Sequence, residues 1–132
     1  MKKLLLLSFL FLAFVVSSSA QSFYLGKTSA FIKQEKGEPF KTDYKDGKTI
    51  YAYKKVSQKG EESVTMYYFN SSSKCITIVQ DFEMWFIIPW TDELSQKYKR
   101  LDKYNWLEKD NIIHAVSVVN DDKFIYIIKY KD

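Results

Sequence analysis

The chain has 132 residues, of which 20 are Lys or Arg, 16 are Asp or Glu and one is His, so its formal charge is +4. This length supports one domain with a single hydrophobic core, and a composition of 46% hydrophobic and 17% aromatic residues excludes a disordered chain. The small net charge argues against a protein that binds polyanions mainly by electrostatics, and the single Cys excludes an intramolecular disulfide.

The first 20 residues have the pattern of a secretory signal peptide. Two lysines give a positive start, residues 4–16 are almost all apolar, and small residues stand at Ser18 and Ala20, which a signal peptidase reads. The apolar run is shorter than the ~20 residues of a spanning helix. We therefore expect cleavage before Gln21, a mature domain over residues 21–132 without a membrane span, and a periplasmic or secreted location.

The first half of the mature chain predicts a helix followed by a meander. Thr28 is a typical N-cap, and Gly37 followed by Pro39 is a typical helix end, so a helix is expected over residues 28–36. Runs of alternating β-branched and aromatic residues follow, separated by polar turns. These runs predict three antiparallel strands, at residues 49–56, 63–69 and 75–82.

The second half predicts another helix and two more strands. Thr91 can cap a helix over residues 92–103, which has acids in its first turn, lysines in its last and apolar residues at i, i+4 and i+7. Two strand-like runs, 111–119 and 123–130, flank the Asn120-Asp121-Asp122 turn.

The expected order of elements is therefore α-β-β-β-α-β-β. Such an order is typical of an α+β fold, here an antiparallel sheet of about five strands with two helices packed on one face. Because a helix followed by a meander occurs twice, the order also allows a weak internal repeat.

A pattern of backbone-shaping residues runs through residues 25–83. Gly26-Lys27-Thr28 opens the first helix, Ile32 stands on its buried side, Gly37-Glu38-Pro39 ends it, and a Tyr-rich strand leads to Tyr68-Phe69-Asn70. This pattern resembles the SmpA/OmlA family of small outer-membrane assembly lipoproteins and, more distantly, the β-lactamase inhibitor protein. The resemblance implies a helix laid on an antiparallel meander that contacts other proteins and is not an enzyme.

Three departures limit what this resemblance implies. Lys36 stands where the family usually has an apolar residue, the family's usual second helix is not visible here, and no Cys follows the apolar leader to carry a lipid. The resemblance therefore does not imply membrane anchoring or membership in an assembly complex. The chain as a whole looks like the small secreted proteins of bacteria.

Aromatic residues are the most distinctive chemical feature of the chain. Rings with a polar edge suit protein interfaces and sugar faces alike. Six of them are candidate contact residues for a partner or ligand: Tyr51, Tyr53, Tyr67, Phe69, Trp85 and Trp90. The first four would line an open sheet face if their aliphatic neighbours faced the helices, and would lose that role if their own face were covered. The two tryptophans flank an apolar connection whose simpler role is to cap the core.

The sequence offers little material for catalysis or metal binding. Cys75 and His114 could form a nucleophile and its base if the fold brought them together, but no orienting group or oxyanion-stabilising loop is visible. A buried free Cys usually packs as a small apolar residue. The acids lack metal-ligand spacing and no Gly-rich phosphate loop is present, so no metal or cofactor is expected.

The sequence thus predicts a secreted or periplasmic protein-interaction module without catalytic activity. The expected partner is another envelope or extracellular protein and not a nucleic acid, because the basic residues at 97–103 are typical of a solvated helix face. One alternative is a module that binds a carbohydrate or small ligand through exposed aromatic residues. A weaker alternative is a hydrolase that uses Cys75 and His114.

Overall fold

A computed structural model describes residues 21–56, 60, 62–109 and 111–131 of the chain. The predicted signal peptide lies outside these described residues. The helical elements are α2 (Ser29–Lys36), the 3₁₀ turn η1 (Met84–Phe86) and α3 (Ile87–Lys97). The strands are β1 (Lys41–Lys45), β2 (Lys48–Val56), β3 (Glu62–Phe69), β4 (Cys75–Glu83), β5 (Lys99–Asp102), β6 (Asn105–Glu108), β7 (Ile112–Val118) and β8 (Lys123–Tyr130).

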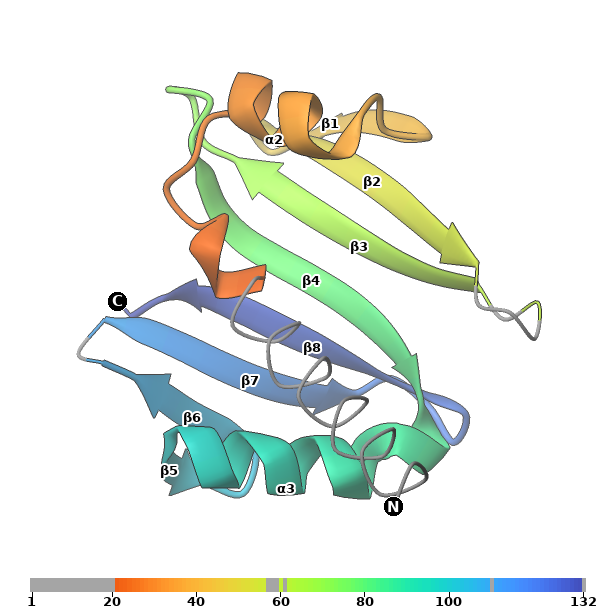
Figure 1. The fold of residues 1–132 in the computed structure, drawn as a ribbon, viewed down its shortest axis with the longest axis vertical. Helices are drawn as coiled ribbons and strands as arrows, with labels where there is room; N and C mark the ends of the chain where they lie inside the picture. Colours follow the sequence, from red (N-terminus) through yellow and green to blue (C-terminus); the bar gives the residue numbers. More distant parts are fainter. Residues whose placement is uncertain (1–20, 57–59, 61, 110, 132) are drawn as a thin grey trace, which may run out of the picture.

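The strands of the described chain form one antiparallel sheet of eight strands, in the order β1-β2-β3-β4-β8-β7-β6-β5 (Figure 1). The predicted fold class, an α+β fold of about five strands with two packed helices, is therefore wrong. Most of the domain is a single large sheet, and the prediction missed the three strands β1, β5 and β6.

The missed strands are short, with four or five residues each, and β1 and β5 are mostly polar, so they lack the alternation that marks a half-buried strand. Every residue of β1 is exposed, as expected for an edge strand. The turn that joins β1 to β2 is carried by Asp46 and Gly47, whose φ angles are 53° and 76°. Apolar periodicity alone does not distinguish such an edge strand from a loop.

The second helix begins and ends earlier than predicted. It ends at Lys97 because Tyr98 is extended, with φ −127° and ψ 159°. Pro89 falls in the first turn of α3, where its missing N–H costs no helical hydrogen bond. The i, i+4, i+7 spacing that predicted the helix instead crosses from α3 into β5, so Leu94 is in the core while Leu101 is exposed.

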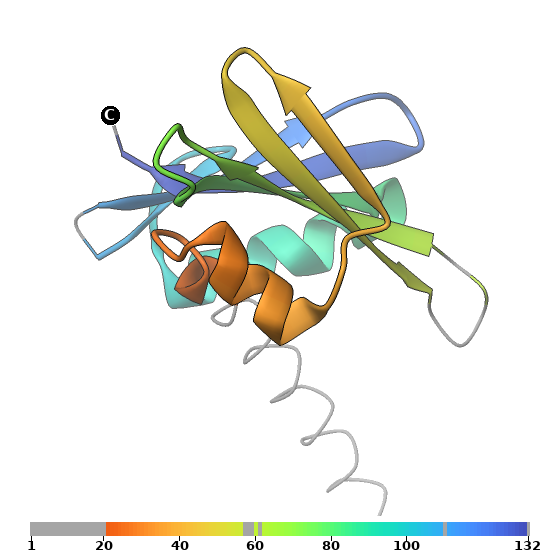
Figure 2. The same ribbon diagram turned by 90° about the horizontal axis from the view of Figure 1, so that it is seen from above.

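The order of elements repeats along the chain. Helix α2 precedes the meander β1–β4, helix α3 precedes the meander β5–β8, and the sheet order is symmetric about the central β4–β8 pair. Both helices lie on the same face of the sheet (Figure 2). The two halves therefore share one core beneath the helices.

The strands contribute mainly aromatic side chains to this core. Ile32 of α2 and Leu94 of α3 are completely buried against it. Its largest members from the strands are Tyr67, Phe69, Trp106, Phe124 and Tyr126. Burial of a large apolar side chain stabilises the fold by ~1.5–3 kcal/mol. This aromatic core therefore joins both halves of the sheet to both helices.

The opposite face of the sheet is aliphatic, and no described helix or strand covers it (Figure 2). Cross-strand register places one apolar row across five neighbouring strands of this face: Ala52, Met66, Val79, Ile127 and Ala115. We call these five residues the aliphatic row. We call the two sides of the sheet the covered face and the uncovered face.

Candidate functional site

The structure places the four strand residues among the predicted contacts on the covered face. Tyr67 and Phe69 are completely buried. Tyr51 packs edge-on against Phe69 at 4.9 Å between ring centres, and Tyr53 packs against Tyr67 at 5.7 Å. The aromatic patch that was conditional on an open face is thus part of the core.

The two tryptophans have opposite environments. Trp90 of α3 is only 4% exposed and packs edge-on against Tyr126. Trp85 of η1 is 68% exposed, and its indole N–H donates to the Glu83 carboxylate at 2.6 Å. Of the six predicted contact residues, Trp85 is therefore the most accessible to a partner or ligand.

Cys75 and His114 are not brought together as a catalytic pair. Cys75 starts β4 and His114 lies in β7, with β8 between these two strands. The Cys75 thiol is buried, and this burial raises its pKa to about 12, so it is protonated at neutral pH.

His114 instead belongs to a buried polar cluster beneath α3. Its Nε2 lies 2.6 Å from Oε1 of Glu108, its Nδ1 is hydrogen-bonded to the Tyr126 hydroxyl, and the Tyr98 ring stacks on it at 4.2 Å. The hydrogen bond from His114 lowers the pKa of Glu108, and burial raises the pKa of Tyr126. Both ring nitrogens thus have partners, which is what a buried imidazole requires.

The hydrogen bonds of this cluster are consistent with one tautomer of His114. An ionised Glu108 accepts a hydrogen bond from Nε2–H, which leaves Nδ1 as acceptor for the Tyr126 hydroxyl. None of these side chains lines either of the two cavities described below. The arrangement therefore satisfies polar groups in the core.

The sheet splits between β3 and β4. Their pairing ends at Thr65 and Gln80, although β3 continues to pair with β2 and β4 with β8. Beyond this point the Val64 N–H donates to the Asp81 carboxylate at 2.7 Å in place of a ladder bond. A side chain thus ends the pairing and opens a wedge between the two strands.

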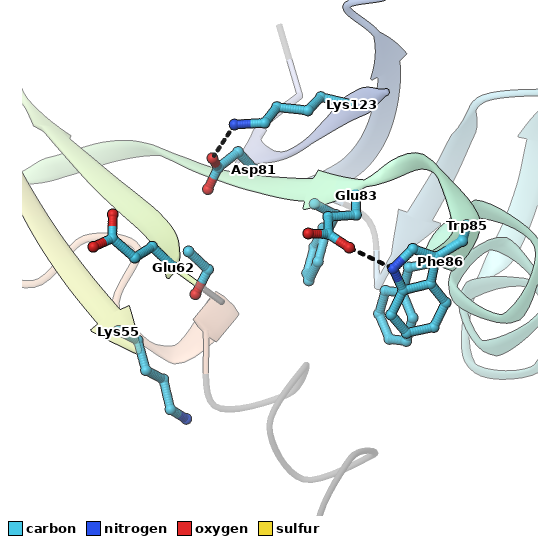
Figure 3. A pocket seen from close by; sticks show the side chains of 9 residues that line it. Lys55, Glu62, Asp81, Glu83, Trp85, Phe86 and Lys123 are labelled. Carbon is cyan, nitrogen blue, oxygen red and sulfur yellow. Dashed lines mark hydrogen bonds and ion pairs between the residues drawn. The ribbon is translucent and has the colours of Figure 1, made fainter. Parts of the chain in front are cut away.

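A pocket of about 280 Å³ occupies this wedge. Figure 3 shows Lys55 and Glu62 on one side and Trp85 with Phe86 on the other. Phe82 and Phe86 pack against each other at 5.3 Å and, with Trp85, supply the apolar wall. Ser63 and charged side chains form the remainder of the lining. We call this pocket the apolar notch after its aromatic wall.

A second cavity of about 490 Å³ lies between α2 and the covered face of the sheet. Its lining is mainly polar and comes from the start of the described chain, from α2 and from strands β2 to β4: Gln21, Tyr24, Glu35, Lys36, Tyr53, Lys54, Lys55, Ser63, Thr65, Tyr67 and Gln80. We call it the polar cavity. Lys55 and Ser63 line both the polar cavity and the apolar notch, so the two are adjacent parts of one groove.

The polar cavity was not found from the sequence, although a signal for it exists. On the covered face the aromatic and aliphatic residues give way to Ser63, Thr65 and Gln80. Polar residues at positions that face the core mark a place where the helices do not close over the sheet. Recognising this would have required knowing which face the helices cover.

Among the described residues, no group of three or more His, Cys, Asp or Glu side chains is arranged to hold a metal ion. In the same part of the chain, no helix is both long and apolar enough to span a bilayer. Comparisons with protein-family models, with curated proteins and with solved structures give no match.

Proposed function

We propose that this protein is a non-catalytic binding module, exported to the periplasm or secreted, that contacts a partner protein through the uncovered face of its sheet. The observation that carries the proposal is the aliphatic row, which continues across five strands with no described element over it. Met66, Ala115 and Ile127 of this row are half-buried, whereas Ala52 and Val79 are only 7% and 9% exposed. An apolar area that continues across one face of a monomer is typical of an interaction site.

The surroundings of the row support a protein partner. Ion pairs on the same face flank it, including Lys54 with Glu62 at 3.1 Å and Lys123 with Asp81 at 3.9 Å. An apolar centre with a polar, charge-balanced rim is the usual composition of a protein interface. A nucleic acid would require an excess of unpaired basic side chains.

Export and the absence of catalysis rest on different arguments. Export to the periplasm or beyond is proposed from the leader over residues 1–20. The non-catalytic role is supported by the protonated Cys75 thiol and by the enclosed His114 cluster.

The proposal is tested by photo-crosslinking in the cells that express the full-length chain. A photoreactive residue at Ile127 should give a discrete protein adduct, and Met66→Lys in the same row should abolish it. The matched control is Ile88→Lys, which changes an exposed apolar residue of α3 and should leave the adduct unchanged. No adduct at Ile127, or an adduct that survives Met66→Lys, would contradict the proposal.

A further inference from the structure

The polar cavity has an excess of positive charge. Its lining includes Lys36, Lys54 and Lys55 against one acid, Glu35. Lys54 is already paired with Glu62. Lys36 and Lys55 thus remain as two cationic groups facing a single carboxylate.

Lys36 is exposed and its ammonium lies beside two aromatic rings, an arrangement that favours its charge. Its ammonium lies 4.8 Å from the centre of the Tyr24 ring and 5.7 Å from that of Tyr67. Partial burial lowers its pKa, Lys55 lowers it further, and Glu35 opposes the shift. An anion placed between the two lysines would favour the charged form of Lys36 and so oppose that shift.

Neutral polar groups stand beside these lysines. The Tyr53 hydroxyl donates to the Gly37 carbonyl and the Tyr67 hydroxyl to Gln21, so both are engaged. In contrast, the side chains of Thr65 and Gln80 line the cavity and make no hydrogen bond within the described part of the chain. They can donate to acceptor oxygens of a ligand.

The apolar notch adjoins this cationic region at Lys55 and Ser63. Its wall is fixed by ring packing, with Trp85 edge-on to Phe86 at 5.3 Å and Phe86 against Phe82 at 5.3 Å. The two parts together give a groove with unpaired lysines at one end and an aromatic wall at the other. Three acids also line the aromatic end, but each has a partner: Lys54 pairs with Glu62, Lys123 pairs with Asp81, and the Trp85 indole donates to Glu83. The volumes of its parts fall near those of small-molecule sites.

We propose that this groove binds a small amphiphile, a carboxylate carried on an apolar chain or ring. The carboxylate lies between Lys36 and Lys55, and the apolar part lies on Phe82, Phe86 and Trp85. The groove includes none of the aliphatic row, so this site goes beyond the proposed protein-binding function and does not depend on it.

The test uses protein expressed from the full-length sequence, labelled with ¹⁵N and titrated with octanoate, 3-phenylpropionate and octanol. Either carboxylate, or both, should shift the Trp85 indole N–H and the Ser63 and Thr65 amide signals in a saturable way. The carboxylate that binds more tightly shows whether the groove prefers an apolar chain or an apolar ring on the ligand. Octanol should bind at least about tenfold more weakly, because it lacks the charge.

Variants separate the groove from other apolar surfaces. Lys36→Gln and Lys55→Gln should each weaken carboxylate binding by about tenfold. The amide spectrum of each variant should remain that of a folded protein. Ser63→Phe should block the junction of the two parts, and Ser117→Phe on the uncovered face is its matched control.

Three results would overturn the inference. These are no saturable shift at millimolar carboxylate, equal binding of octanoate and octanol, and shifts confined to the uncovered face. The crosslink at Ile127 can be measured in the Lys36→Gln protein. Loss of carboxylate binding with the crosslink retained would show that the ligand site and the partner-contact face act independently.

Discussion

The two faces of the sheet are built from different side chains although they share every strand. The covered face buries rings, whereas the uncovered face carries mainly Ile, Val, Ala and Met. Several aliphatic residues are nonetheless almost inaccessible, with Ile50 at 7% and Val79 at 9% exposure. Neighbouring side chains on a sheet shield one another laterally, so low exposure of single residues does not show that a face is covered.

The rings of the covered face and the aliphatic residues of the uncovered face contribute differently to stability. A ring on the covered face has contacts from a helix as well as from its own sheet, so its removal leaves a cavity. An aliphatic residue on the uncovered face loses only lateral contacts. The same strand should therefore tolerate change on one face and not on the other.

The largest expected effect tests this directly with two adjacent residues of β3. Phe69→Ala should lower the free energy of unfolding by about 3–5 kcal/mol, because its ring is completely buried. Tyr68→Ala on the uncovered face should lower it by about 1 kcal/mol. Urea denaturation measures both. Equal losses would contradict the assignment of the two faces.

The next effect concerns the polar cluster of the covered face. Glu108→Gln should lower the free energy of unfolding at pH 7 by about 2 kcal/mol, since it removes the charge from the bond to His114. The pKa of Glu108 is lower in the folded state than its ordinary value of 4.5. Its contribution is therefore full above that value and is lost as the pH falls through the folded-state pKa.

Melting temperatures between pH 3 and pH 7 check this prediction. Wild type and Glu108→Gln should differ most at neutral pH and converge at acid pH. The control is Asp121→Asn in the exposed turn before β8, which should follow the wild-type curve. A constant difference at all pH values would mean that the Glu108 charge does not stabilise the fold.

The sequence predicted those elements whose apolar pattern is strong. The first helix begins and ends within one residue of its expected bounds, because Thr28 caps it through a bond to the Phe31 N–H and Gly37 closes it at φ 82°. Strands β2, β3 and β4 lie where their alternation placed them. The edge strands β1 and β5 were missed because their residues are all exposed and so carry no apolar alternation, and β5 was predicted as part of the second helix.

The candidate site was harder to predict than the strands. Alternation shows that two faces exist but not which one the helices cover, so Tyr51 and Tyr67 could be assigned to an open face or to the core. The split between β3 and β4 depends on Asp81 taking the Val64 N–H, a contact between residues far apart in the chain. Single-sequence patterns contain no signal for such a contact.

A smaller loss of stability is expected at Gly26, beside Tyr130. Gly26 has φ 81°, and an added Cβ would lie 2.7 Å from the Tyr130 hydroxyl. Gly26→Ala should lower the free energy of unfolding by about 1–2 kcal/mol. Gly37→Ala has a similar φ but an open surrounding, so it should cost less. Thermal unfolding of both variants measures the contribution of the contact, and an equal loss would exclude it.

The smallest effect is expected on the uncovered face. The pair of Lys54 and Glu62 has an N–O distance of 3.1 Å, but both side chains are more than one third exposed. Glu62→Gln should therefore change the free energy of unfolding by at most about 0.5 kcal/mol, and by less at high salt. Urea denaturation at low and high ionic strength measures this change. A loss of about 2 kcal/mol that persists in salt would mean that the pair is shielded from solvent, and the two faces would then differ less than their side chains indicate.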